Sequence, residues 1–503
     1  MVFRKVWREI PKTLQLRKNE ILGEIDTKGR MQDCVYNSML AGEVAPAPTL
    51  DIEHVEELIP KDLPRKLKSY QLADLSKSLG RRYVFNINKP GYGKTLETIL
   101  WMRLNLTPPF QVLILCPKTV IETAWYPQLN LYWPNWQKEG TFWITNYEQL
   151  YNEQRFKLAC EMHWDCIILD ESHTIKSFSS KITQRVFKLH GDARHCLTGT
   201  PVKNRPEDLA AQLKWLDPSS ITTYTEFQFA FCDMRRDAWG WKAKGLTKDE
   251  KKIEHLQQLL DLYCVGGEEH DIGVNGEPER IKVRLKLDSK VKKLYQQIVG
   301  EYDAETKQHV IDTEALLRQG VKVSNAIEAA TRRQQVASNP QLFDAQLKNV
   351  KFEWIVNWLK GTEEKVVIMS KFAETIDTLE RQLGAAGLSF KKISRSMNPQ
   401  MRKRMIDSWA KSSQALIGTF GVLATGTDGL QEACRYEIHI DRNWDHSAND
   451  QAERRIYRTG QGGKVVIYVL QAIGTIDVKI EHVQWQKGQD ATKLLQFVSD
   501  DEN

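Results

Sequence analysis

One stretch of the chain has the residue types and the spacing that bind phosphate groups. Residues 88–95 read NKPGYGKT and lie between a short apolar run and a segment with helical periodicity. Glycines let backbone N–H groups curl around phosphate oxygens, and the N-terminus of the following helix adds partial positive charge. Lys94 would neutralise the β- and γ-phosphates, and Thr95 would offer its hydroxyl to Mg²⁺. The residues expected to contact the nucleotide are Pro90, Gly91, Tyr92, Gly93, Lys94 and Thr95.

A pair of carboxylates follows a second apolar run, Cys166–Leu169. Asp170 would hold Mg²⁺ through water, and Glu171 would polarise the water that attacks the phosphate. Each element has an alternative. An Asp-Glu pair after a strand can cap a helix, and a GxGKT run with Asn88 in place of the usual first glycine can arise by chance. Together, in this order, the two elements predict a site for a nucleoside triphosphate and Mg²⁺.

The carboxylate pair also carries a family resemblance. Residues 170–173 read DESH and match the DExH box of superfamily-two helicases and translocases. Residues 197–201, LTGTP, resemble the third motif of that superfamily, which connects its ATP site to its nucleic-acid track. An ordinary turn closed by proline is the alternative for this segment. Residues 67–72, LKSYQL, are similar to the family segment in which a glutamine reads the adenine edge, which implies that Gln71 selects ATP.

A stretch near the C-terminus narrows the resemblance. Residues 451–461, QAERRIYRTGQ, resemble the signature of Swi/Snf-type translocases. Arg455 and Arg458 are three residues apart, so in a helix they would share one face. In the family this face closes onto the γ-phosphate held by the other lobe, where an arginine stabilises the charge that develops in phosphoryl transfer. The alternative is a basic, solvated helix.

Further motifs of the same family follow in the family's order, so that the resemblance covers roughly residues 65–490. They are residues 370–372, 424–429, 440–446 and 474–480. One family feature is missing. A basic Arg-Arg-x-Lys-x-Asp-Val segment usually enters the second lobe, whereas residues 264–272 here read CVGGEEHDI. Coupling between the lobes is therefore expected to differ, or to use another basic element.

Short apolar runs must position these motifs. They are residues 83–85, 112–115, 142–145, 166–169 and 195–197, then 366–369, 416–418, 437–440 and 465–470. Near-continuous apolar strands of this kind suit parallel sheets that are covered on both faces. A helix is expected at residues 373–386, with Gly387 where its C-terminal cap belongs. The predicted fold is α/β, with two RecA-like parallel-sheet lobes.

The remaining segments complete the expected domain organisation. The predicted first and second lobes span residues 65–220 and 351–503, respectively. Residues 221–350, rich in charge and helix formers, are expected to form a helical insertion and bridge, and residues 1–64 a short accessory segment. Residues 231–241, FCDMRRDAWGW, resemble the fork-remodelling, strand-annealing branch of the family. Their tryptophans could fill a helical core, or exposed Trp239 or Trp241 could stack on bases at a DNA junction.

Composition limits the class of protein. The 503 residues are 41% hydrophobic and 27% charged, and the net charge of +6 permits a nucleic-acid partner without requiring one. The cysteines form no CxxC pair, so neither a zinc site nor a disulfide framework is expected. Without a signal peptide or a run of ~20 apolar residues, we expect a soluble intracellular protein with no membrane partner. Its compartment would be the cytoplasm in a prokaryote or virus and the nucleus in a eukaryote.

The resemblance implies an ATP- and Mg²⁺-dependent enzyme that moves on double-stranded or branched DNA and remodels forks, junctions or recombination intermediates. Two other functions stay open: a helicase that separates DNA or RNA strands, and a remodeler that displaces DNA-bound proteins. A metabolic kinase with the same phosphate-binding loop would leave the QAERRIYRTGQ segment unexplained.

Overall fold

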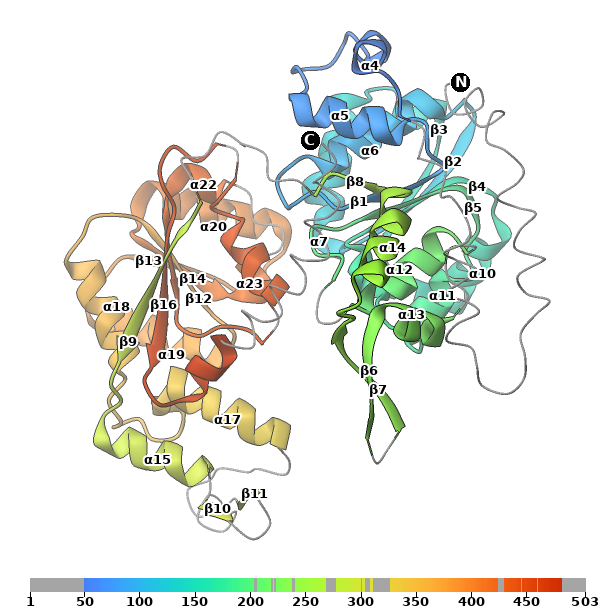
Figure 1. The fold of residues 1–503 in the computed structure, drawn as a ribbon. Coiled ribbons are helices and arrows are strands. Elements are labelled where there is room, and N and C mark those ends of the chain that lie inside the picture. Colours follow the sequence, from blue (N-terminus) through green and yellow to red (C-terminus); the bar gives the residue numbers. More distant parts are fainter. Residues whose placement is uncertain are drawn as a thin grey trace. The chain divides into compact units, whose positions relative to one another are not determined.

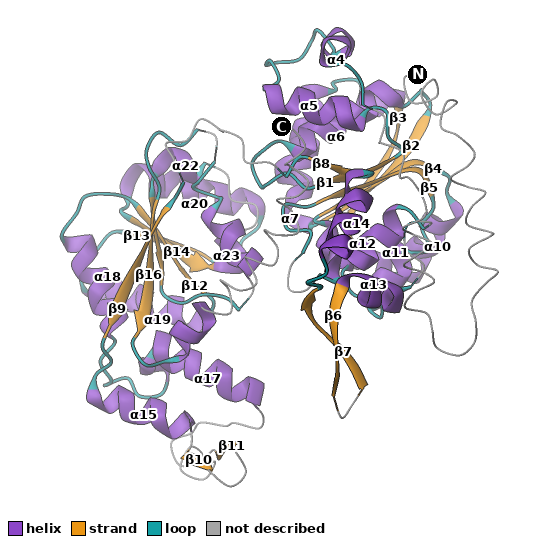
Figure 2. Cartoon of the chain, in the orientation of Figure 1, coloured by secondary structure: helices purple, strands orange, loops and turns teal. Residues whose placement is uncertain are grey.

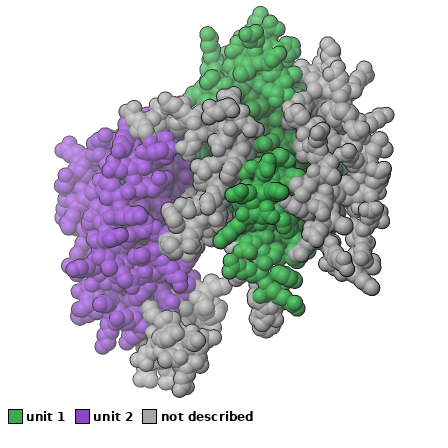
Figure 3. All heavy atoms as spheres, in the orientation of Figure 1, with its two compact units in different colours: residues 1–270, 487–503 green, residues 271–486 purple. Residues whose placement is uncertain are grey.

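The computed structural model describes residues 49–202, 206–218, 220, 223–237, 240–267, 277–299, 301–303, 308–310, 326–423, 429–444, 446–458 and 460–481. The chain forms two compact units, drawn in two colours in Figure 3. Unit 1 comprises Met1–His270 and Lys487–Asn503, and unit 2 comprises Asp271–Gln486. Within the described ranges, no helix combines the length and the apolar character needed to cross a bilayer.

Unit 1 is built on a six-stranded sheet in the order β3-β2-β4-β5-β1-β8, and all its strand pairs are parallel. The strands are β1 (Tyr83–Asn86), β2 (Phe110–Cys116), β3 (Gly140–Asn146), β4 (Trp164–Asp170), β5 (Gly191–Leu197) and β8 (Cys264–Val265). Side chains alternate between two apolar cores: Leu113 and Ile167 belong to one, Val112 and Ile168 to the other. A sheet with two buried faces explains why these strands are apolar throughout.

Helices of unit 1 cover both faces of this sheet (Figures 1 and 2). They are α4 (Ile52–Leu58), α5 (Ser69–Ser78), α6 (Lys94–Asn105), α7 (Lys118–Val120), the π-turn η3 (Ile121–Trp125), α8 (Tyr126–Tyr132), α9 (Trp136–Glu139), η4 (Tyr147–Tyr151), α10 (Glu153–Glu161), η5 (Ser172–Ile175), α11 (Lys181–Val186), α12 (Asp208–Leu216), α13 (Tyr224–Phe231) and α14 (Glu250–Asp261). Helix α4 lies within the expected accessory segment, yet its Val55 is fully buried in a core of unit 1. The packed part of unit 1 therefore begins before residue 65.

Unit 2 repeats the architecture with a parallel sheet in the order β13-β14-β12-β15-β16-β9. Its strands are β9 (Glu279–Leu285), β12 (Val366–Ser370), β13 (Phe390–Ile393), β14 (Ala415–Thr419), β15 (Tyr436–His439) and β16 (Val466–Ala472). Its helices are α15 (Ser289–Val299), α17 (Ala326–Ser338), η6 (Pro340–Leu342), α18 (Val350–Lys360), α19 (Ala373–Ala385), α20 (Pro399–Ser412), α21 (Phe420–Leu423), α22 (Leu430–Ala433) and α23 (His446–Glu453), and β10 (Glu301–Asp303) pairs with β11 (Gln308–Val310). The prediction of two parallel-sheet lobes is confirmed.

Helix α19 ends as its sequence predicted. Gly387 has a φ of +69°, and its N–H donates to the carbonyl of Gly384. The N–H of Leu388 donates to the carbonyl of Leu383 at 3.0 Å. This pair of bonds is the Schellman arrangement, which favours glycine because the left-handed conformation costs it least.

The segment 221–350 differs from the expected helical insertion. Besides helices, it contains the antiparallel hairpin β6–β7 (Cys232–Asp237 and Gly240–Leu246), and its strands β8 and β9 extend the sheets of unit 1 and unit 2. The alternative that the tryptophans of FCDMRRDAWGW fill a helical core is therefore wrong for Trp241. Trp241 belongs to a strand and is exposed, whereas Trp239 lies outside the described residues. Cross-strand pairing overrides the helical tendency of the neighbouring segments.

Candidate nucleotide-binding site

The loop between β1 and α6 depends on the glycines of its sequence. Gly91 and Gly93 have φ values of +90° and +103°. A residue with a Cβ atom would be strained in this conformation. A Cβ atom on Gly93 would also lie 2.4 Å from Nε2 of Gln71. Gly93 precedes α6, and no side chain caps this helix. The first N–H groups of the helix, which have no intrahelical acceptors, are thus suited to bind an anion.

Helix α5 supports this loop through buried side chains. Gln71 is 2% exposed; its Nε2 donates to the carbonyl of Tyr92 at 3.1 Å, and its Oε1 accepts from the N–H of Lys68. The hydroxyl of Tyr70 donates to the same Tyr92 carbonyl at 3.0 Å. Gln71 is thus next to the predicted loop and holds its backbone. Its reading of adenine stays a prediction.

The carboxylate pair lies at the end of β4, whose last residue is Asp170. Oδ2 of Asp170 accepts from Nε1 of Trp125 at 2.9 Å, and Oδ1 accepts from the N–H of Glu171. Glu171 has a φ of +53°, the single positive value among the described residues other than glycine. Such a conformation costs roughly 1 kcal/mol, so the surrounding contacts must hold it. Glu171 precedes η5 without a side-chain capping bond, so the helix-capping alternative is wrong.

The electrostatics of the pair favour a bound cation. Burial and the charge of Glu171 raise the pKa of Asp170 to about 6. Oε2 of Glu171 is buried, lies 3.3 Å from Nδ1 of His173, and accepts no hydrogen bond within the described ranges. Two neighbouring, partly buried carboxylates are stabilised by a cation, and oxygen donors such as Asp170 and the hydroxyl of Thr95 suit Mg²⁺. The donor set therefore fits the metal.

Strand register brings three sequence motifs to one edge of the sheet. Asn86 of β1 and Asp170 of β4 both pair with Leu197 of β5, so the strands end at one level. A Cβ atom on Gly199 would lie 2.5 Å from Cδ of Pro90, so the LTGTP turn touches the phosphate-binding loop. On its other side, Oγ1 of Thr198 lies 3.0 Å from Nδ1 of His173 in the DESH segment. The LTGTP turn therefore contacts both the glycine-rich loop and the DESH segment, and is not an isolated turn.

Sequence reasoning missed two aromatic side chains that fix Asp170. Nε1 of Trp125, in the π-turn η3, donates to its carboxylate, and the hydroxyl of Tyr147 donates to its backbone carbonyl at 2.9 Å. π-turns frequently lie at functional sites. Nothing in the sequence marks the turn, because it depends on how residues 117–126 pack.

A buried polar cluster behind the loop was also missed. Nδ2 of Asn88 donates to Asp74 at 2.6 Å and lies 3.2 Å from Oε2 of Glu97. Nδ2 of Asn86 donates to the same Glu97 oxygen at 2.6 Å. Burial and the charge of Asp74 raise the pKa of Glu97 well above its usual range. The one sequence signal was Asn88 itself, in the place of a glycine. Lys94 bridges the same loop, since its Nζ donates to the carbonyl of Asn88 at 2.7 Å.

Asn88 also contacts the chain where the family's basic segment is missing. The N–H of Gly267 lies 3.4 Å from Oδ1 of Asn88. A Cβ atom on Gly266 would lie 2.2 Å from the same Oδ1, and both glycines have positive φ values. The paired glycines after β8 therefore leave the room that the Asn88 side chain fills.

In unit 2, the arginines of the QAERRIYRTGQ segment do not share a helix face. Helix α23 ends at Glu453, and Arg455 and Arg458 lie in the turn and bend that follow. The N–H of Arg455 donates to the carbonyl of Ala452, and that of Arg458 to Ile456. The expectation that Arg455 and Arg458 form an i, i+3 pair on a helix is wrong, because the helix ends at Glu453, before Arg455.

Glu453, in the same segment, anchors this turn. It is 2% exposed, and Arg280 of β9 donates to its Oε2 from Nε at 2.9 Å and from Nη2 at 2.7 Å. Nη1 of Arg442 donates to its Oε1 at 2.6 Å. Burial opposes ionisation, but the charges of Arg442 and Arg280 lower the pKa of Glu453 to about 2. Through Glu453, the QAERRIYRTGQ segment is thus tied to the segments of unit 2 that carry Arg280 and Arg442.

The other predicted motifs of unit 2 meet in its interior. Asp441 accepts from the hydroxyl of Ser370 at 2.6 Å and from the N–H of Lys371, which joins the segments 370–372 and 440–446. Lys351 is buried against Asp477 of the segment 474–480 at 2.8 Å. Residues 424–428 lie outside the described residues.

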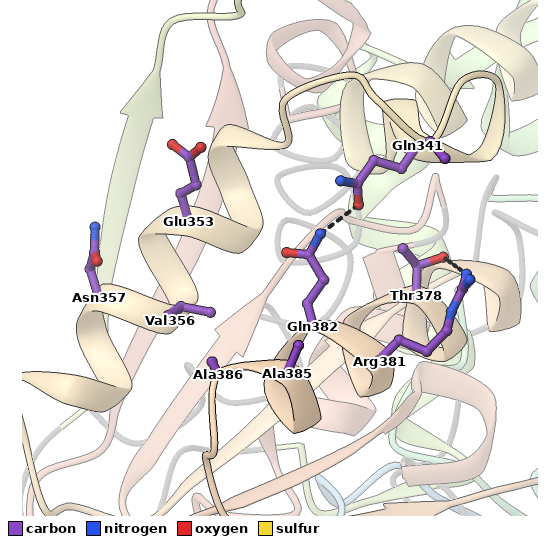
Figure 4. A pocket seen from close by; sticks show the side chains of 10 residues that line it. Gln341, Glu353, Val356, Asn357, Thr378, Arg381, Gln382, Ala385 and Ala386 are labelled. Carbon is purple, nitrogen blue, oxygen red and sulfur yellow. Dashed lines mark hydrogen bonds between the residues drawn. The ribbon is translucent and has the colours of Figure 1, made fainter.

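A separate pocket of about 680 Å³ lies between α18, α19 and η6 (Figure 4). Across it, Nε2 of Gln382 donates to Oε1 of Gln341 at 2.8 Å. None of the residues predicted to bind nucleotide or to catalyse lines this pocket.

Comparisons with known proteins identify two domains. Residues 134–342 match the SNF2-related domain, and residues 350–460 match the helicase conserved C-terminal domain. The chain is 23% identical over 485 residues to the CHD3-type chromatin-remodeling factor CHR7 of Arabidopsis thaliana, covering 86% of this chain and 38% of that protein. It is 24% identical over 428 residues to the SWI/SNF-related matrix-associated actin-dependent regulator of chromatin subfamily A member 1 of Mus musculus, covering 78% of this chain and 39% of that protein.

The chain thus spans well under half the length of these two relatives. Among solved structures, the SWI2/SNF2 ATPase core of Sulfolobus solfataricus in complex with dsDNA matches with 21% identity and a TM-score of 0.38, covering 86% of this chain and 98% of that one.

The fit between Asn88 and Gly266 generates a first prediction. Asn88→Gly restores the usual glycine, yet it should destabilise unit 1 by about 1–3 kcal/mol, because buried Asp74 loses the hydrogen bond from Nδ2 of Asn88. Gly266→Ala should also destabilise, through backbone strain and through collision with Asn88. In the double variant Asn88 is gone, so the collision disappears. The loss of unfolding free energy in the double variant should therefore be smaller than the sum of the losses in the two single variants.

Urea unfolding of the single and double variants measures this coupling. Gly387→Ala is the matched control, since its φ of +69° resembles the +75° of Gly266 and no atom lies within 4 Å of its added Cβ. Its effect should add to that of Asn88→Gly. If the effect of Gly266→Ala also simply added to that of Asn88→Gly, the predicted contact would be contradicted.

Glu453 generates a prediction about pH. Its folded pKa lies below its unfolded value of ~4.3, so its stabilisation is present above that value and is lost as pH falls toward 2. Glu453→Gln should destabilise unit 2 by about 3 kcal/mol at pH 7, because two arginines lose their counter-charge. The gap between wild type and variant should shrink between pH 4 and pH 2, as followed by denaturant unfolding.

Glu279→Gln is the control for this variant, because Glu279 pairs with Lys464 at the surface of the same unit. Its effect should stay below ~1 kcal/mol at every pH. A pH-independent gap for Glu453→Gln would refute the assigned charge state.

Proposed function

Because the chain belongs to the SNF2-related class of superfamily-two ATPases, we propose that it is a motor that couples ATP hydrolysis to movement along double-stranded DNA. The observation that carries the proposal is the convergence of the GxGKT loop, the DESH pair and the LTGTP turn at one edge of a parallel sheet. Open α/β sheets bind ligands at the carboxyl ends of their strands. The QAERRIYRTGQ segment adds the element that a simple kinase would lack.

The proposed chemistry assigns separate roles to the residues of unit 1. Lys94 exchanges its bond to the Asn88 carbonyl for the β- and γ-phosphates, and Thr95 and Asp170 hold Mg²⁺. The metal supplies charge neutralisation on the phosphate oxygens. Glu171 orients and polarises the attacking water through the carboxylate oxygen that accepts no bond from the described chain. Gln71 selects the adenine base.

Arg455 and Arg458 of unit 2 are proposed to stabilise the charge that develops on the transferred phosphoryl group. Glu453 holds the turn that carries them, so the arginines are presented by a fixed backbone rather than by a helix. An ATP-dependent approach of this turn to unit 1 would link hydrolysis to motion, as expected for two-lobe motors.

The DNA form and the biological role are finer proposals. One relative is named as a chromatin-remodeling factor and the other as a regulator of chromatin, which favours DNA as the track. Among DNA substrates we favour forks, junctions and recombination intermediates, on the resemblance of residues 231–241. The corresponding compartment is the cytoplasm of a prokaryote or infected cell, or a nucleus. A remodeler that displaces DNA-bound proteins is the second candidate, favoured by the same relatives.

The decisive test is steady-state ATPase activity without nucleic acid and with single-stranded DNA, duplex DNA, forked DNA and RNA. We expect duplex or forked DNA to stimulate turnover most. Lys94→Ala and Glu171→Gln should each lower stimulated turnover about 100-fold or more, and only Glu171→Gln should retain ATP binding. Arg458→Ala should leave ATP binding nearly intact while reducing turnover.

Glu161→Gln, at an exposed site, and Arg435→Ala, which removes a surface ion pair with Glu364, serve as charge controls and should behave as wild type. Stimulation by single strands or RNA alone would move the assignment to a strand-separating helicase. Normal turnover in Glu171→Gln would overturn the catalytic roles, and no stimulation by any DNA would overturn the motor.

A further inference from the structure

The hairpin β6–β7 extends from unit 1 and leaves an aromatic side chain in solvent. Its base is anchored: Met234, Ala243 and Leu246 pack against an apolar core of unit 1. Beyond this base the two strands run away from the body of the unit, past α13 (Figure 1). A two-stranded ribbon that leaves its core contributes little to stability by itself.

Trp241 lies on this outer part. It pairs in register with Arg236 across the ribbon and is 53% exposed. Seven other tryptophans, Trp101, Trp125, Trp133, Trp136, Trp164, Trp215 and Trp409, are buried. The ring of Phe229 on α13 lies 6.0 Å from that of Trp241 at an interplanar angle of 71°, so the indole is supported on one side. A supported but exposed indole is suited to stack on a planar ligand.

The charge of the hairpin indicates which class of ligand it would bind. Residues 232–246 contain four basic and two acidic residues. Asp233 is already paired with Arg235 at 3.0 Å, whereas Arg236, opposite Trp241, is exposed. An arginine beside an exposed aromatic ring attracts a phosphate and leaves the ring to an adjacent base. An acidic protein surface would use the arginine but would not need the indole.

We propose that this hairpin is a binding site for unpaired DNA, in which Trp241 stacks on a base and Arg236 contacts a neighbouring phosphate. Bases inside a duplex are stacked on each other, so the site favours single strands and the single-stranded arms of forks. The proposal deepens and rests on the proposed function, since it adds a substrate preference to a motor whose track is duplex DNA.

The test measures binding of fluorescent single-stranded, forked and blunt duplex DNA by anisotropy, together with ATPase activity stimulated by blunt duplex. Trp241→Ala should weaken single-strand and fork binding about ten-fold or more, and Trp241→Phe should restore much of it. Arg236→Ala should reduce the slope of log K against log salt for single strands by about 0.7. Both variants should keep duplex-stimulated ATPase activity.

Leu158→Ala and Lys157→Ala on α10 are the controls, since Leu158 is 51% exposed and the side chain of Lys157 is 78% exposed in the same unit. They should change none of these quantities. Unchanged fork binding in Trp241→Ala, with normal duplex-stimulated activity, would overturn the hairpin site and leave the motor intact. Equal loss of duplex and single-strand binding would overturn the preference for unpaired bases. A wild-type protein that binds no DNA would overturn the motor itself.

Discussion

In unit 1, strands β4, β5 and β1 are hydrogen-bonded neighbours that run in the same direction and end at the same level. Strand β4 continues into the carboxylate pair, β5 into the LTGTP turn, and β1 into the glycine loop that starts a helix. These three motifs lie close together because of strand order and register, and no long side chains are needed to connect them. The contact between Gly199 and Pro90 is possible because the turn has no side chain there.

The two units stabilise buried charge in opposite ways. In unit 2, the carboxylate of Glu453 is paired with Arg280 and Arg442, whose charges keep it ionised down to low pH. In unit 1, Asp170 and Glu171 lie side by side, and burial together with the charge of Glu171 raises the pKa of Asp170. A network of satisfied ion pairs fixes a structure, whereas a carboxylate pair with raised pKa is completed by a bound cation. The first arrangement fixes the turn after α23, and the second is the metal site that we propose.

The sequence predicted the fold and the place of the glycine-rich loop between β1 and α6, because apolar strands and glycine-dependent loops are local features. Gly93 shows why: its φ and its close contact with Gln71 both exclude a side chain. Long-range contacts were harder to foresee. Glu453, the last residue of α23, is held by an arginine 173 positions away in β9. The hairpin β6–β7 was missed because its flanking segments are strong helix formers and its pairing is specified between strands.

Two places where the chain departs from the family pattern are in contact with each other in unit 1. Asn88 stands where the loop usually has glycine, and the chain after β8 lacks the usual basic segment. The side chain of Asn88 occupies the space above Gly266, lies within hydrogen-bonding distance of the N–H of Gly267, and donates to Asp74 beneath the loop. A glycine at 88 would leave that space empty, and a larger residue at 266 could not share it. The loop between β1 and α6 is thus packed directly against Gly266 and Gly267, the last described residues of unit 1 before unit 2 begins. A neutral amide takes this position because two carboxylates, Asp74 and Glu97, are already buried there, and it can donate to both while accepting from the backbone.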